Sequence, residues 1–194
     1  MKALRRFSLY QRLSGSSTIV RRYFVVNGFD GALTMLGIVM GFYVSGAEQL
    51  EVIISACLGA AIALCMSGVS SAYISETAER SRDLKALEDA MVTDLQASDH
   101  GRASRLIPVW IALVNGLSPL IISLLIILPL WLGSTIDGFP VDPLIASVIV
   151  TLIIIFLLGV FLGRIGASFW LWAGLRTLLL ALLTCGIILL VSMV

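Results

Sequence analysis

The chain has 194 residues, of which 59% are hydrophobic and only 13% are charged, and its mean hydropathy is +1.03. A soluble domain is about half apolar and about a quarter charged, so this composition excludes an ordinary soluble protein. The formal net charge is only +1, and no nucleic-acid partner is expected. The composition predicts an integral membrane protein that is embedded in a lipid bilayer.

Five stretches are apolar enough to cross a membrane, for which a helix needs about 20 residues. They are continuously apolar and do not alternate with a period of two, which favours helices over a β-barrel. We therefore predict an all-α, polytopic membrane protein with five transmembrane helices. The five predicted spans are residues 23–44, 50–74, 106–132, 143–163 and 169–194.

The distribution of positive charge predicts the orientation. Six of the thirteen Lys and Arg residues precede the first span, five lie between spans two and three, and two lie near the start of span five. The connections 45–49 and 133–142 contain none. Because positive loops stay in the cytoplasm, the N-terminus is expected to be cytoplasmic and the C-terminus outside. No organelle signal is visible, so a multi-pass protein of the cell membrane is expected.

The chain is predicted to begin with a basic cytoplasmic segment, residues 1–22, without a removable signal peptide. Residues 2–13 resemble a short basic amphipathic helix, which would lie on lipid headgroups or act as a solvated arm. Residues 14–18 are expected to form a polar linker. Spans one and two then occupy 23–75, an acidic helical insertion 76–105, and spans three to five 106–194.

Asp30 is the only carboxylate deep inside a predicted span, since Glu51 lies at the very start of span two. A charge at that depth costs several kcal/mol unless it is paired, solvated or bound to a cation. Glycines surround it at 28, 31, 37 and 41, which would let another backbone or an ion approach closely. The pattern predicts a cation site around Asp30.

Span two is polar along one side. Ser67, Ser71 and Ser75 recur every four residues, with Met66 near the same face. This face would pack against another helix, or it would form a hydrated wall that faces Asp30. Apolar residues continue at helical spacing up to Leu95, so the helix of span two is expected to extend into the cytoplasm.

The extension carries acids at Glu76, Glu79 and Asp83. Carboxylates at this spacing can gather a divalent ion, or they can form a solvated face, which the residues alone favour. His100, the only histidine, is expected in a surface turn.

Span three carries Asn115 and, four residues later, Pro119 in mid-membrane. The proline frees a carbonyl one turn back, which marks either an ion path or a packing kink. Span four is almost wholly aliphatic and is expected to face lipid. Trp170 and Trp172 are expected to anchor the membrane interface, to which Arg176 can reach back.

Three local motifs resemble the vacuolar iron transporter family. Residues 29–33 are similar to the family's Asn-Asp-Gly-Leu stretch in span one. Met66 and Ser67, with residues 73–75, resemble the Met-Ser and Glu-Tyr-Val-Ser motifs of span two. Residues 174–176 resemble the start of span five. The resemblance implies a homodimeric antiporter that moves Fe²⁺ and often Mn²⁺ out of the cytosol in exchange for protons.

The resemblance also implies roles for individual residues. Asp30 would be the pore carboxylate and Met66 a second metal ligand, and Glu76, Glu79 and Asp83 would capture metal on the cytoplasmic side. Ser67, Ser71 and Asn115 are further candidates for the lining of the transport pore. The chain departs from the family in two ways: Ala72 stands where the family has a glutamate, and the insertion has only about 30 residues.

The leading hypothesis is a transporter of Fe²⁺ or Mn²⁺, with the metal as substrate and no resident cofactor. An enzyme is not expected, because the predicted spans contain no histidine–carboxylate cluster and no nucleophile–base pair. The remaining alternative is a membrane scaffold or assembly protein whose Asp30 pairs with a partner helix.

Overall fold

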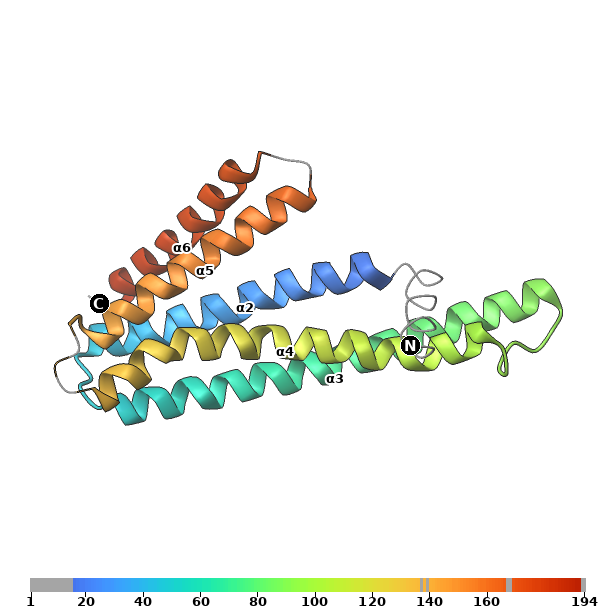
Figure 1. The fold of residues 1–194 in the computed structure, drawn as a ribbon, viewed down its shortest axis with the longest axis horizontal. Coiled ribbons are helices and arrows are strands. Elements are labelled where there is room, and N and C mark those ends of the chain that lie inside the picture. Colours follow the sequence, from blue (N-terminus) through green and yellow to red (C-terminus); the bar gives the residue numbers. More distant parts are fainter. Residues whose placement is uncertain (1–15, 137, 139, 167–168, 193–194) are drawn as a thin grey trace. The chain divides into compact units, whose positions relative to one another are not determined.

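A computed structural model describes residues 16–136, 138, 140–166 and 169–192, with residues 16–19 described by their backbone alone. The predicted amphipathic helix at 2–13 lies outside this part. The described residues form helices and contain no strand, which confirms the all-α class (Figure 1). The helices are α2 (Ser16–Ser45), α3 (Leu50–Met91), α4 (Asp99–Thr135), α5 (Pro143–Ile165) and α6 (Trp170–Ser192).

All five of these helices contain a stretch long and apolar enough to cross a membrane, so the prediction of five spans is confirmed. The helix of span two also continues without a break to Met91, as expected. Two local predictions were wrong. Ser16–Ser45 is one helix, so residues 16–18 are helical and do not form a linker. His100 is exposed, as expected, but it lies in the first turn of α4 and not in a turn between helices, because the Ser98 hydroxyl accepts a bond from the Gly101 amide and starts the helix there.

The chain divides into two compact units, and α2, α3 and α4 each contribute residues to both. The first unit contains residues 16–24 and 65–117. The second contains residues 25–64 and the chain from 118 onward.

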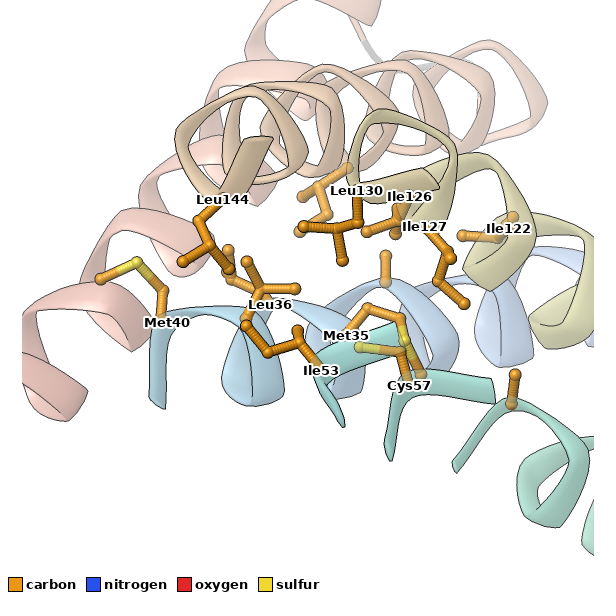
Figure 2. Packing of buried hydrophobic residues seen from close by; sticks show 14 of the residues in the cluster. Met35, Leu36, Met40, Ile53, Cys57, Ile122, Ile126, Ile127, Leu130 and Leu144 are labelled. Carbon is orange, nitrogen blue, oxygen red and sulfur yellow. The ribbon is translucent and has the colours of Figure 1, made fainter. Parts of the chain in front are cut away.

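The second unit has a continuous core of buried apolar side chains from α2, α3, α4, α5 and α6. In α2 the buried residues recur at helical spacing, from Ala32 through Met35 and Leu36 to Val39. Ile53 and Cys57 of α3 meet them, together with side chains of α4 (Figure 2). Since lipid is as apolar as these side chains, close packing rather than loss of contact with water stabilises such a core.

Glycines allow the backbones of the second unit to approach closely. A Cβ added at Gly31 of α2 would lie 2.8 Å from the Cα atom of Pro119 in α4. A Cβ added at Gly159 of α5 would collide with the hydroxyl of Thr177 in α6. The expectation that span four faces lipid therefore holds for only part of its surface, because a face that runs from Leu144 to Gly163 is buried.

In the first unit, α3 and α4 cross at Gly68 and Gly116. The side-chain amide of Asn115 donates a hydrogen bond of 2.7 Å to the carbonyl of Gly68. A Cβ added at Gly116 would lie 2.5 Å from the carbonyl oxygen of Cys65. A small apolar cluster around Ile107 and Ile111 of α4 packs against Tyr23 of α2.

Candidate functional site

Asp30 lies on an exposed face of α2. Neighbouring positions Ala32 and Met35 are fully buried, whereas the Asp30 side chain is exposed. It forms no hydrogen bond or ion pair with any residue that the structure describes. The carboxylate is therefore not enclosed by a fixed neighbour within the described chain.

On the C-terminal side of Asp30, the same face of α2 carries small residues. Thr34, Gly37 and Gly41 follow at the spacing that places side chains on one side of a helix. No described atom lies within 4 Å of a Cβ built at Gly37 or Gly41. This side of α2 is thus open to another backbone, to lipid or to water.

The predicted pore residues of α3 are also exposed. Met66 has a relative exposure of 60%, and Ser67 and Ser71 lie beside it on the surface of the first unit. The hydroxyl of Ser71 donates a long bond of 3.4 Å to the carbonyl of Gly68 in its own helix. A thioether and two hydroxyl oxygens are therefore free to contact something outside this unit.

Asn115 does not lie on an exposed face of the first unit, as a residue that lines a pore would. It is buried, and its amide is bound to α3 at Gly68. Its contact with the backbone stabilises the crossing of α3 and α4. A direct contact between Asn115 and a transported ion stays a prediction.

The three acids of the insertion differ in exposure. Glu76 has a relative exposure of only 3%, whereas Glu79 and Asp83 are exposed. The hydroxyl of Tyr23 donates a 3.3 Å bond to one carboxylate oxygen of Glu76, and Nε of Arg80 lies 3.7 Å from the other. Glu76 thus joins α2 to α3 through a buried polar cluster.

Of the two partners of Glu76, the sequence indicates Arg80 but not Tyr23. The spacing of Glu76 and Arg80 by four residues is a signal for an ion pair on a helix. Tyr23 is 53 residues away from Glu76, and nothing in the local pattern indicates their contact. Ala72 is buried on the same face as Glu76, one helical turn earlier. A buried carboxylate therefore lies one turn from the position where the resemblance leads us to expect one.

A small cavity of about 180 Å³ lies between α3 and α4 in the first unit. Its polar lining comes from Arg80, Asp83, His100 and Ser104. Arg80 and Asp83 bring charges of opposite sign to this cavity, so the lining does not single out a cation as its ligand.

Among the described residues, no group of three or more His, Cys, Asp or Glu side chains is close enough to share a metal ion. Asp30 belongs to the second unit, whereas Met66 and Glu76 belong to the first. The joint action of these residues on one ion stays a prediction.

The sequence model of the VIT family matches residues 81–193, which is more than half of the chain. This range covers the end of α3 and the helices α4, α5 and α6, and it does not include Asp30 or Met66.

A relative is known from Methanocaldococcus jannaschii, where it is an uncharacterized protein. It is 29% identical over 172 residues, which cover 87% of this chain and 85% of the relative. No solved structure matches this chain. The match to the family model, together with the five apolar helices, shows that this chain is a multi-pass membrane protein that belongs to the VIT family.

Proposed function

We propose that this protein transports Fe²⁺, Mn²⁺ or both out of the cytosol in exchange for protons, with Asp30 as the carboxylate that the ion contacts. Membership of the VIT family indicates membrane transport of metal ions. The choice of ion, the coupling to protons and the role of Asp30 go beyond that membership. They rest on the chemistry of the exposed residues of α2 and α3.

The exposure of Asp30 without a partner in the described chain is the observation that carries the proposal. An ionised aspartate at the centre of a membrane helix costs about 3 kcal/mol when only lipid surrounds it. A buried ion pair would remove this cost, but the structure describes none for Asp30. Water and a visiting cation would remove it equally well, which is the situation in a transport pore.

A homodimer would turn this exposed face into the wall of a pore. Asp30, Gly37 and Gly41 lie on one side of α2, and small residues permit close contact between membrane helices. A second copy of the chain would shield the carboxylate from lipid, whereas a lone subunit would leave it exposed. In this arrangement each subunit contributes one Asp30 to the ion path.

The ligand types favour a divalent transition metal. Carboxylate oxygens suit Mn²⁺ and Fe²⁺, and a thioether such as that of Met66 shifts the preference toward softer ions. A single carboxylate holds either a proton or a metal ion. Competition between them at Asp30 would therefore exchange one for the other as the ion passes.

Metal flux into proteoliposomes with an imposed pH gradient tests the proposal. Asp30→Asn keeps the size of the side chain but removes its charge, so we expect flux of Fe²⁺ and Mn²⁺ to fall by at least about a hundredfold, as for loss of an essential charge contact of about 3 kcal/mol. Asp30→Glu keeps the charge and should retain part of the flux.

Glu48→Gln is the matched control, because Glu48 is an exposed acid in the connection between α2 and α3. Its flux should equal that of the unmodified protein. Normal transport by a folded Asp30→Asn protein would remove Asp30 from the mechanism. Two results together would favour the scaffold alternative. The unmodified protein would show no metal flux, and a partner protein that purifies with it would no longer purify with the Asp30→Asn variant.

A further inference from the structure

The hairpin of α5 and α6 contains two arginines and no acid. Arg164 lies in the last turn of α5, and Arg176 lies in α6, about 9 Å along the helix from Trp170 at 1.5 Å per residue. From Pro143 to Val194 the sequence contains neither Asp nor Glu. The hairpin therefore has no side chain of its own that could neutralise either arginine.

Arg176 is exposed, and it forms no hydrogen bond or ion pair with any residue in the described ranges. Arg164 is exposed as well, and its guanidinium carbon lies 6.0 Å from the centre of the Trp170 ring. Only 11% of the apolar window of α6 is buried. Since α6 is a membrane span, the surroundings of Arg176 are lipid unless another protein covers this helix.

The residues around Arg176 are those of a membrane interface. Trp172 has a relative exposure of 61% and lies one helical turn before Arg176, on the same side of α6. Aromatic rings of this kind settle at the level of the lipid headgroups. From its position in the helix, the long side chain of Arg176 can reach back to that level while its methylene groups stay in apolar surroundings.

On the other side of Arg176, toward the C-terminus, α6 carries a shallow apolar groove of about 440 Å³. No described atom lies within 4 Å of a Cβ built at Gly186, so the absence of a side chain there forms a shallow depression in the surface of α6. The groove is lined by Leu179, Leu182, Leu183, Gly186, Ile187 and Leu190. The surface of α6 thus presents, in order, an aromatic ring, a guanidinium and an apolar groove.

We infer that this surface binds one anionic phospholipid, whose phosphate contacts Arg176 beside Trp172 and whose acyl chain lies along the groove. The planar guanidinium can donate two parallel hydrogen bonds to a phosphate. A leaflet of hydrocarbon is about 15 Å thick, and the groove from Leu179 to Leu190 extends about 17 Å along the helix. A free phosphate ion would bring no apolar group to the groove, so a lipid fits this surface better.

Native mass spectrometry of the purified, delipidated full-length protein tests the inference. Phosphatidylglycerol and phosphatidylcholine of the same chain length are titrated separately. We expect the unmodified protein to bind phosphatidylglycerol more tightly, and Arg176→Gln to weaken that binding about fivefold, as for loss of one cation near an anionic surface. Arg82→Gln, which removes an exposed arginine of the cytoplasmic part of α3, is the matched control and should bind as the unmodified protein does.

Two more measurements distinguish a bound lipid from a free anion and from a second copy of the chain. Inorganic phosphate should not displace phosphatidylglycerol, since it cannot fill the groove. Asp30→Asn should leave lipid binding unchanged; tighter lipid binding by this variant would show that Arg176 pairs with Asp30 of another copy, which overturns the inference. Equal binding of the two lipids by the unmodified protein would overturn it too.

Arg176→Lys keeps the charge and serves as the second variant if Arg176→Gln does not fold. It should still prefer phosphatidylglycerol, but bind it more weakly because an ammonium group lacks the two-pronged contact. Unchanged binding by this variant would argue against a guanidinium–phosphate contact.

Discussion

Glu76 and Glu79 are three residues apart on α3, yet they have opposite surroundings. Glu76 is enclosed and contacts Tyr23 and Arg80, whereas Glu79 is exposed. A buried carboxylate contributes to stability only as long as its partners satisfy it, and removing its charge also leaves the partner unsatisfied. The two acids should therefore respond differently to the same substitution.

We predict that Glu76→Gln destabilises the protein by about 1–3 kcal/mol, because the mostly buried Arg80 loses its counter-charge. Glu79→Gln should change stability by less than about 0.5 kcal/mol, as is usual at an exposed position. Thermal unfolding of both variants in the same detergent measures the difference. Equal melting temperatures would show that the cluster around Glu76 contributes no stability.

Under the proposed function, the exposed acids Glu79 and Asp83 would make the first contact with a metal ion from the cytosol. We predict that Glu79→Gln combined with Asp83→Asn weakens the binding of Mn²⁺ measured by calorimetry by about fivefold or more, because each exposed carboxylate contributes up to about 1 kcal/mol. Glu51→Gln, at the opposite end of α3, should bind Mn²⁺ normally. Unchanged binding by the double variant would leave these acids as a solvated face.

At the scale of the helices, α3 and α4 can cross closely because Gly116 has no side chain. A Cβ at Gly116 would collide with Val69 and with the carbonyl oxygen of Cys65. Backbone atoms cannot move aside as a flexible side chain can, so the helices would have to separate. Separation would also break the bond between Asn115 and the carbonyl of Gly68, which is buried in the same contact.

We predict that Gly116→Ala destabilises the protein by about 1–3 kcal/mol, the usual cost of overpacking. Gly186→Ala is the matched control in an equally helical position, since no described atom lies within 4 Å of the added Cβ. It should leave the melting temperature unchanged or raise it slightly, because alanine favours a helix. If Gly116→Ala melts as the control does, the contact is looser than the structure describes.

At the scale of the whole molecule, the proposed function requires two copies of the chain. Gly37 and Gly41 leave an open strip on α2 beside Asp30, so a larger side chain there would not disturb the packing of the subunit itself. The same side chain would hold two subunits apart if they meet at this strip.

We therefore predict that Gly37→Leu raises the dissociation constant of the dimer about tenfold, as for a loss of about 1–2 kcal/mol between membrane helices. The melting temperature of the subunit should change little. Light scattering across a range of protein-to-detergent ratios measures the dimer, with Gly186→Leu on α6 as the control. An unchanged dimer in Gly37→Leu would place the contact between subunits elsewhere.

The sequence by itself determined the number and type of the spans, because the free energy of transfer into lipid depends on composition and length. It also predicted the extension of α3 beyond its apolar span, where apolar residues keep a helical period, and the family resemblance that the family model later confirmed. These properties depend on residues that are near one another along the chain.

Only the tertiary structure decided three properties of the candidate site residues. Asp30 is exposed, Glu76 is buried, and the Asn115 side chain is hydrogen-bonded to α3. The side of a helix that is buried depends on which other helices pack against it, and a continuously apolar span has no polar face to indicate this. The contact of Tyr23 with Glu76 likewise joins residues 53 apart, and no local spacing encodes such a contact.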